Sequence, residues 1–201
     1  MPTKRQQVLD FMRQQTVVRP KELVTVGLPK DYLYQLTKEG VVERLGRGLY
    51  QLVNSDVSEW ASYVELQSRV PKGVFCLLSA LVFHNIGTQN PHKLWIAIPN
   101  KAWRPMIDYP PVNYTTMSGD ALVECIETHR IEGVNIRIYS AAKTVADCFK
   151  FRNKVGLDVA LEALKEGWRD KKFTMDELMV CAEICRVRKV IQPYAESIVH
   201  R

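Results

Sequence analysis

Residues 27–52 read GLPKDYLYQLTKEGVVERLGRGLYQL, and the pattern within them changes from helical to extended. Pro29 precedes Leu33 and Leu36, which lie at the spacing of one helix face. Gly40 then suits the left-handed backbone that commonly ends a helix. We therefore predict a helix that starts at Pro29 and ends at Gly40.

A β-hairpin is predicted directly after this helix. The runs 41–44 and 49–52 are β-prone, and a glycine-rich connection that contains Arg47 joins them. Upstream, residues 4–14 carry apolar side chains at helical spacing. Pro20 stands where a second, short helix would begin, since the first helical position has no need of an N–H donor. Three helices followed by a hairpin predict a winged helix-turn-helix.

The rest of the chain predicts a mixed α+β domain with a helical C-terminal end, so the fold class is α+β. Polar residues 54–58 show no periodicity, and we place the domain boundary there, with the winged helix-turn-helix at 1–53 and the α+β domain at 54–201. Helices are predicted at 59–69 and 75–86, strands at 92–98, 112–117, 123–131 and 134–139, and helices from Ala141 onward.

Two patterns stand out in the helical C-terminal end. One apolar stripe is formed by Leu157, Leu161, Leu164 and Trp168. Thr174 and Glu177 have the spacing of a capping box, in which each residue satisfies a free N–H group of the other at the start of a helix.

Positive charge is concentrated in the first 52 residues. They carry nine Lys or Arg and five acidic residues, a net charge of +4. The other 149 residues add only +2 to reach the total of +6. Clustered positive charge favours a nucleic-acid partner, because it neutralises phosphates.

The exposed side of the predicted third helix supplies the candidate base contacts. With Leu33 at the centre of the buried side, Tyr34, Gln35 and Lys38 fall on the opposite side. Tyr34 and Gln35 can reach base edges in the major groove, and the amide of Gln35 favours adenine. Lys30 and Lys38 can neutralise phosphates. We therefore predict that this is the recognition helix for double-stranded DNA.

Further cations flank this helix in the predicted domain. Arg47 lies between two glycines at the tip of the wing, where the backbone can approach DNA closely. A phosphate or minor-groove contact and a solvated turn arginine are both open for it. Lys4 and Arg5, at the N-terminal end of the first helix, are further candidate phosphate contacts.

One charged cluster marks the second domain. Lys143 and Asp147 lie one helical turn apart in SAAKTVAD, and Arg152 follows close by. Ion pairing on a helix surface explains the spacing, and a surface that recognises a partner is the alternative. We predict that these three charges form a surface that recognises a partner.

Signatures of enzymes and metal sites are missing from the sequence. It holds no GxGxxG, no GxxxxGK[ST] and no GxSxG. The five cysteines, without a CxxC pair, suggest reduced core thiols, and His84 is interpreted as a hydrogen-bonded helix residue. We expect no catalytic activity, no cofactor and no metal.

The sequence also shows neither a signal peptide nor a membrane span. The longest apolar run, 74–86, is too short to cross a bilayer and is interpreted as a buried helix. We expect a cytoplasmic protein without a membrane partner.

Three motifs together span nearly the whole chain. They are the quoted stretch Gly27–Leu52, then CLLSALVFHNIGTQNP (Cys76–Pro91), then VNIRIYSAAKTVADCFKFRNKVGLDVALEAL (Val134–Leu164). In this order they resemble the AbiEi antitoxins of bacterial type IV toxin–antitoxin systems. One departure is Lys143, whose position often holds arginine in the family.

The resemblance implies a repressor that binds inverted repeats in the promoter of its own operon. It also implies a C-terminal domain that opposes a nucleotidyltransferase-like toxin, without requiring a stable complex with that toxin. For that domain we predict Lys143, Asp147 and Arg152 as the antitoxin surface. Two alternatives remain from the residues themselves. One is a stand-alone winged-helix transcription factor with a ligand-sensing C-terminal domain. The other is a nuclease, against which stands the lack of a metal-ligand cluster or an acidic residue followed by Glu-x-Lys.

Overall fold

The computed structural model describes residues 2–15, 17–53, 59–107 and 110–199. The chain forms two compact units. The N-terminal unit comprises residues 1–69 and 130–135, and the C-terminal unit comprises residues 70–129 and 136–201. The predicted boundary at 54–58 lies outside the described residues, and the division at 53 stays a prediction.

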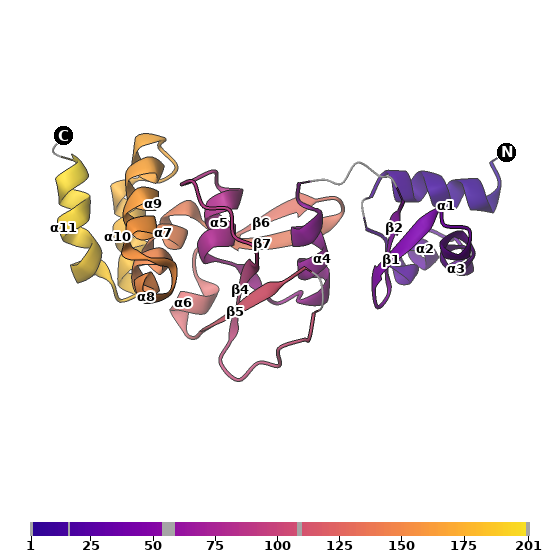
Figure 1. The fold of residues 1–201 in the computed structure, drawn as a ribbon, viewed down its shortest axis with the longest axis horizontal. Coiled ribbons are helices and arrows are strands. Elements are labelled where there is room, and N and C mark those ends of the chain that lie inside the picture. Colours follow the sequence, from indigo (N-terminus) through magenta and orange to yellow (C-terminus); the bar gives the residue numbers. More distant parts are fainter. Residues whose placement is uncertain (1, 16, 54–58, 108–109, 200–201) are drawn as a thin grey trace. The chain divides into compact units, whose positions relative to one another are not determined.

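The N-terminal unit contains the predicted three helices and hairpin (Figure 1). Its elements are α1 (Lys4–Arg13), α2 (Pro20–Thr25), α3 (Asp31–Lys38), β1 (Val42–Gly46), β2 (Leu49–Leu52) and α4 (Ala61–Arg69). α3 begins two residues after the predicted Pro29, with Lys30 as its N-cap. Gly40 adopts a positive φ of 71°, as expected for the residue that closes the helix.

One apolar core holds the winged helix together. α1, α2 and α3 each turn one face inward, and the first residue of β1 closes the cluster. Its buried members are Val8, Leu9, Met12, Val18, Leu23, Leu28, Leu33, Leu36 and Val42. β1 and β2 pair antiparallel, and an isolated bridge from Val18 to Tyr50 adds a third strand position to the wing.

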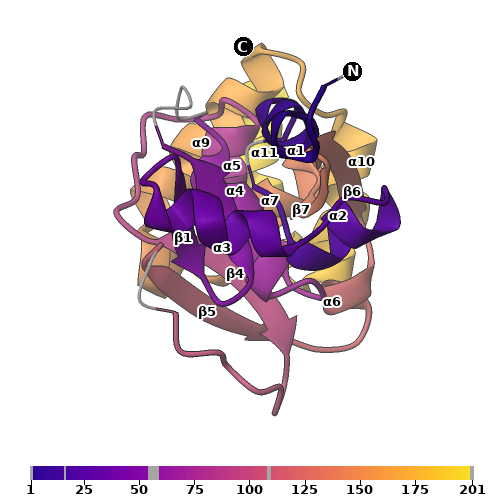
Figure 2. The ribbon, with the colours of Figure 1, turned by 90° about the vertical axis from the view of Figure 1, so that its right-hand side faces the viewer.

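The C-terminal unit is built on a five-stranded mixed sheet, of which only residues 130–135 are assigned to the N-terminal unit. Its strands are β3 (Val74–Phe75), β4 (Leu94–Pro99), β5 (Val112–Met117), β6 (Ile126–Ile131) and β7 (Val134–Tyr139), in the order β5-β4-β3-β7-β6. β3 pairs antiparallel with β4 and parallel with β7, while β4 pairs parallel with β5, which lies at the sheet edge (Figure 2). Glu132 and Gly133, both at positive φ, form the turn of the predicted β6–β7 hairpin.

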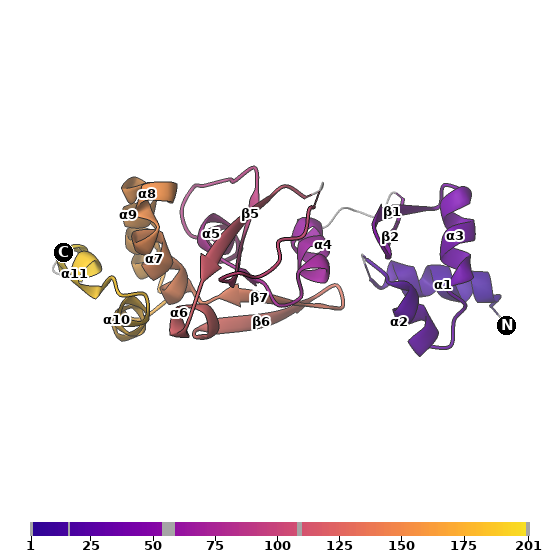
Figure 3. The same ribbon diagram turned by 90° about the horizontal axis from the view of Figure 1, so that it is seen from below.

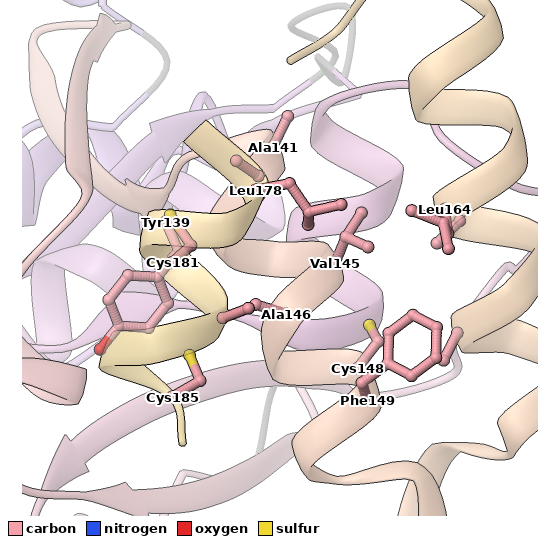
Figure 4. Close-up of a cluster of buried hydrophobic side chains, with 14 of the residues drawn as sticks. Tyr139, Ala141, Val145, Ala146, Cys148, Phe149, Leu164, Leu178, Cys181 and Cys185 are labelled. Atoms are coloured by element: carbon pink, nitrogen blue, oxygen red, sulfur yellow. The ribbon is translucent and has the colours of Figure 1, made fainter. Parts of the chain in front are cut away.

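Seven helices complete this unit among the described residues. They are α5 (Leu77–Phe83), α6 (Asp120–Val123), α7 (Ala141–Lys150), α8 (Arg152–Val155), α9 (Leu157–Arg169), α10 (Met175–Ile184) and α11 (Arg188–Val199). The last five of them, α7 to α11, lie together (Figure 3). α7 is the central helix, since residues 141–149 are all buried and α5, α9 and α10 contact it. Figure 4 shows its Val145, Ala146 and Phe149 among side chains of the neighbouring helices.

The predicted fold class is confirmed, as α+β with an N-terminal winged helix and a helical C-terminal end. The capping box of Thr174 and Glu177 is present at the start of α10. Among the described residues, no helix combines the length and the apolar character that crossing a bilayer would require.

Two predicted elements are wrong in their bounds. The run 74–86 is not one helix, because Val74 and Phe75 form the central strand β3 and α5 starts only at Leu77. A buried apolar run of this length has no periodicity that separates a short strand from a helix. Residues 123–125 are not part of the predicted strand either, because α6 ends at Val123 and β6 begins at Ile126.

The predicted apolar stripe of α9 is only partly buried. Leu157 is 39% exposed, and Leu161 and Trp168 are only half-buried. The buried face instead consists of Val159, Ala160, Ala163, Leu164 and Gly167. Small side chains allow close packing here, and a Cβ on Gly167 would lie 2.4 Å from the ring of Phe173. The predicted stripe therefore shares Leu164 with the buried face, but the pattern of large apolar residues missed the small residues that pack most closely.

Candidate functional site

Helix α3 presents a polar face to solvent. Its apolar residues Leu33 and Leu36 are each 1% exposed, while Tyr34 is 63% exposed and Gln35 and Lys38 are exposed beside it. We call Tyr34, Gln35 and Lys38 the recognition face. The Lys38 ammonium lies 4.7 Å from the centroid of the Tyr34 ring, so a cation and an aromatic ring form one continuous surface.

The wing next to this helix is a tight hairpin. Arg47 and Gly48 form its two-residue turn, and Gly48 takes a positive φ of 72°. A bulge between Arg44 and Gly46 shifts the register, and the Arg44 guanidinium donates to the Gly46 carbonyl at 3.0 Å. Arg47 is exposed at the tip, where its side chain is available to a phosphate or a groove.

The remaining predicted phosphate contacts lie at helix starts. Lys4 and Lys30 are exposed. Arg5 is exposed too, but its guanidinium donates to the Glu39 carboxylate at 2.7 Å. Exposed ion pairs of this kind contribute only about 0–1 kcal/mol, so a phosphate can compete with Glu39 for Arg5. Contact of all these residues with DNA stays a prediction.

Sequence reasoning missed the residues that brace the wing against α4. The Arg69 guanidinium donates to the Leu45 carbonyl at 2.7 Å and to the Glu65 carboxylate at 2.6 Å. Gly46 passes so close that a Cβ there would lie 2.0 Å from the Arg69 guanidinium. Burial raises the pKa of the Glu65 carboxyl, and the charge of Arg69 opposes that shift. The signal in the sequence was the spacing of Glu65 and Arg69 by one helical turn.

A second brace joins the same two parts. The Arg19 guanidinium, from the N-cap of α2, donates to the Ser68 carbonyl at 2.6 Å. The winged helix is therefore fixed to α4 at two places, through Arg19 and through Arg69. Residues 61–69 belong structurally with the hairpin that precedes them.

The predicted antitoxin surface is wrong as a surface. Lys143 and Asp147 are both 0% exposed, and the Lys143 ammonium donates to an Asp147 carboxylate oxygen at 2.6 Å inside the core. A spacing of one helical turn is equally compatible with an exposed and a buried pair, so the spacing alone could not distinguish the two. Arg152 is half-buried and donates to the Phe149 carbonyl at 2.9 Å.

Two further side chains contact the buried pair of Lys143 and Asp147. The Cys185 thiol donates to the other Asp147 oxygen at 3.2 Å, and the Lys143 ammonium lies 4.0 Å from the centroid of the Tyr139 ring. Burial alone would lower the pKa of Lys143, but the Asp147 carboxylate outweighs it and holds that pKa above its ordinary value. Lys143 therefore stays charged, and the pair ties α7 to the end of α10.

His84 behaves as predicted, as a hydrogen-bonded residue at the end of α5. Its Nε2 lies 2.7 Å from the Tyr139 carbonyl, so Nε2 carries the proton and donates. Burial lowers the pKa of His84, although this hydrogen bond opposes the shift. The ring is thus held neutral in the fold.

The cysteines lie mostly in the core. Four of the five are buried, Cys125 is half-buried, and all are free thiols. Within the ranges that the structure describes, no three His, Cys, Asp or Glu residues stand together as a metal site.

The geometry of the winged helix agrees with a family match over the same residues. Residues 6–53 match the family described as "Transcriptional regulator, AbiEi antitoxin". The predicted family is confirmed for this segment. The AbiEi-type segment contains α2, α3 and the wing, and therefore the whole recognition face together with Arg47. It covers about a quarter of the chain.

The fold of nearly the whole chain has a counterpart among solved structures. The crystal structure of the RV2827C protein from Mycobacterium tuberculosis superposes with a TM-score of 0.59, covering 98% of this chain and 82% of that chain. Sequence identity is 10%, so the likeness concerns the fold alone. No curated protein matches the chain.

Proposed function

We propose that this protein is the antitoxin of a bacterial type IV toxin–antitoxin system. In this role it binds inverted repeats in the promoter of its own operon and represses it. It also counteracts a nucleotidyltransferase-like toxin encoded beside it, and it acts in the cytoplasm without catalysis of its own. The observation that carries the proposal is the AbiEi-type segment with its exposed recognition face.

The arrangement of the winged helix supports the DNA-binding half. Tyr34 and Gln35 offer hydrogen-bonding groups on a rigid helix, and Lys38 and Arg47 offer charge at its end and at the wing tip. A recognition helix in the major groove with a wing on the flanking backbone uses all four side chains. Inverted repeats additionally require two copies of the segment on one DNA site.

The burial of Lys143 and Asp147 bears on which residues could act against the toxin. Because Lys143 and Asp147 lie inside the core, they act on protection through the fold of the C-terminal unit and not by touching a partner. Any contact with toxin would use other, exposed residues of that unit. Protection without a stable complex is equally compatible with this arrangement.

A ligand-sensing transcription factor is the second candidate. It is favoured by a cavity of about 600 Å³ in the C-terminal unit, which is lined by Ser118, Asp120, Lys150, Cys185 and Arg186 among others. Volumes of this size are typical of small-molecule sites. The two candidates differ in one respect, which is whether the neighbouring gene product is toxic on its own.

Co-expression tests the proposal. The neighbouring gene is induced alone, with the intact chain, and with a chain that carries an early stop codon. We expect growth arrest in the first and third cases and restored growth in the second. A neighbouring gene that is harmless alone would contradict the antitoxin assignment and favour the ligand-sensing candidate.

A further inference from the structure

Two cysteines far apart in the sequence meet in the C-terminal unit. The Cys181 thiol on α10 donates to the Cys125 sulfur, with 3.3 Å between the two Sγ atoms. A disulfide requires about 2.05 Å, so the sulfurs need to approach by roughly 1 Å, which side-chain rotation and a small helix shift supply. No other pair of thiols is described at such a distance within residues 2–15, 17–53, 59–107 and 110–199.

The backbone holds both thiols in place. The Cys125 carbonyl accepts from the Ser140 N–H at 2.8 Å, and Cys125 itself has a positive φ of 58°. This conformation is uncommon for a residue with a side chain, and its neighbours fix it. Cys181 lies on α10 and belongs to the buried cluster shown in Figure 4. The short distance between the two sulfur atoms therefore follows from the way the fold packs.

A small molecule can reach the two sulfurs. A cavity of about 440 Å³ opens to solvent and includes Cys125 and Cys181 in its lining. Cys125 is half-buried, whereas Cys76 and Cys148 are fully buried. Cys185 is already engaged with the Asp147 carboxylate.

We propose that Cys125 and Cys181 form an oxidation site, at which a peroxide converts the two thiols into an intramolecular disulfide. In the first step, the Cys125 sulfur takes one oxygen from hydrogen peroxide, giving a sulfenic acid and one water. In the second step, the Cys181 sulfur attacks the sulfenic sulfur, the S–S bond forms, and the hydroxyl leaves as water with the Cys181 proton. Two electrons pass from the thiols to the peroxide, and a dithiol reductant reverses the change.

The order of the two steps follows from the environment. Cys125 is half-buried whereas Cys181 is only 3% exposed, so a peroxide in the cavity reaches the Cys125 sulfur first. Burial raises the pKa of Cys181 to about 12, and the contact with Cys125 adds to the rise. The second step therefore accelerates with rising pH. The charged groups around Cys181 are Lys143 and Asp147 from α7, Glu127 from β6, and Lys172, Asp176 and Glu177 at the cavity.

The test uses the full-length reduced protein treated with hydrogen peroxide. We expect the number of free thiols, measured after denaturation, to fall from five to three, and a non-reducing peptide map to link Cys125 with Cys181. Because the map is made on the unaltered protein, the result does not depend on any variant folding. Retention of all five thiols, or a link between another pair, would overturn the proposal.

Variants separate the roles of the two sulfurs. C181S should stop at the sulfenic acid on Cys125, which dimedone traps, and C125S should form no disulfide. Cys148→Ala removes a buried thiol outside the pair and should leave the disulfide unchanged. Trapping of dimedone on another cysteine of C181S would contradict the assigned order. This site is independent of the proposed DNA and toxin functions.

Discussion

Lys143 and Asp147 form a charged pair inside the core of the C-terminal unit. Both charges are removed from water, so each depends on the other and on the Cys185 thiol and Tyr139 ring around them. Removing one partner of a buried pair leaves an uncompensated charge, whereas replacing both by apolar groups can be nearly neutral. A loss of function in a single variant here would report on folding.

Lys143→Met should lower the free energy of unfolding by about 3–5 kcal/mol, because Asp147 would keep a buried charge without a partner. The double variant Lys143→Met/Asp147→Leu should recover most of that loss. Urea denaturation followed by circular dichroism measures both. A cost below about 1 kcal/mol for the single variant would show that the pair is not buried in solution.

The burial of His84 makes the stability of the fold depend on pH. Burial lowers the pKa of His84 in the folded state, so its contribution to stability is fully present above the unfolded value of about 6.5 and is lost as the pH falls through the lower folded value. Thermal melts from pH 7.5 to 5 should show a falling melting temperature. His84→Gln, which keeps a donor for the Tyr139 carbonyl, should flatten this dependence. An equally steep decline in the variant would assign it to other groups.

At the scale of elements, the winged helix was predictable because its turns have strong local chemistry. Pro20, Gly40 and Gly48 mark a helix start, a helix end and a hairpin turn, and each occupies the position that its backbone preference implies. The exposed face of α3 followed from the burial of Leu33 and Leu36. Nothing in these residues required knowledge of the rest of the chain.

The C-terminal unit was less predictable, for reasons that lie in tertiary packing. β3 has two residues, too few for any periodicity, and exists because β4 and β7 flank it. α9 packs through Ala160, Ala163 and Gly167, and a pattern of large apolar residues cannot show such a face. The brace from Arg69 to the wing depends on a contact across 24 residues.

The recognition face should be necessary for DNA binding in vitro. Replacing Tyr34, Gln35 and Lys38 together by alanine removes exposed groups only, so the melting temperature should change little while affinity for the promoter falls at least tenfold. Gel shifts and circular dichroism measure the two effects. Lys154→Ala/Lys165→Ala is the matched control, since both lysines are exposed in the C-terminal unit and should not alter binding.

The wing makes a separate electrostatic prediction. If Arg47 neutralises one phosphate, Arg47→Ala should reduce the slope of log affinity against log salt by about 0.9. Fluorescence anisotropy with labelled promoter DNA over a range of salt concentrations measures the slope. An unchanged slope would show that the wing does not touch the DNA backbone.

At the scale of the whole molecule, the two predicted tasks should be separable. A fragment of residues 1–53 should bind DNA weakly and fail to protect cells, and residues 54–201 should retain some protection without repression. The fragment of residues 1–53 lacks Ser68 and Arg69, which hold α2 and the wing in place through hydrogen bonds. Its winged helix should therefore be less stable. A fragment of residues 1–69 is the matched control and should bind more tightly than 1–53. Equal binding by the two fragments would show that the braces are not needed.

In the proposed function, one chain represses through α3 and protects through its C-terminal unit. The most direct measurement places the triple alanine variant of the recognition face, in the full-length chain, beside the neighbouring gene and a promoter reporter in the same cells. We expect reporter activity to rise to the level seen without the protein, while growth remains protected. Repression by a folded triple variant, or the loss of protection together with repression at unchanged protein level, would contradict it.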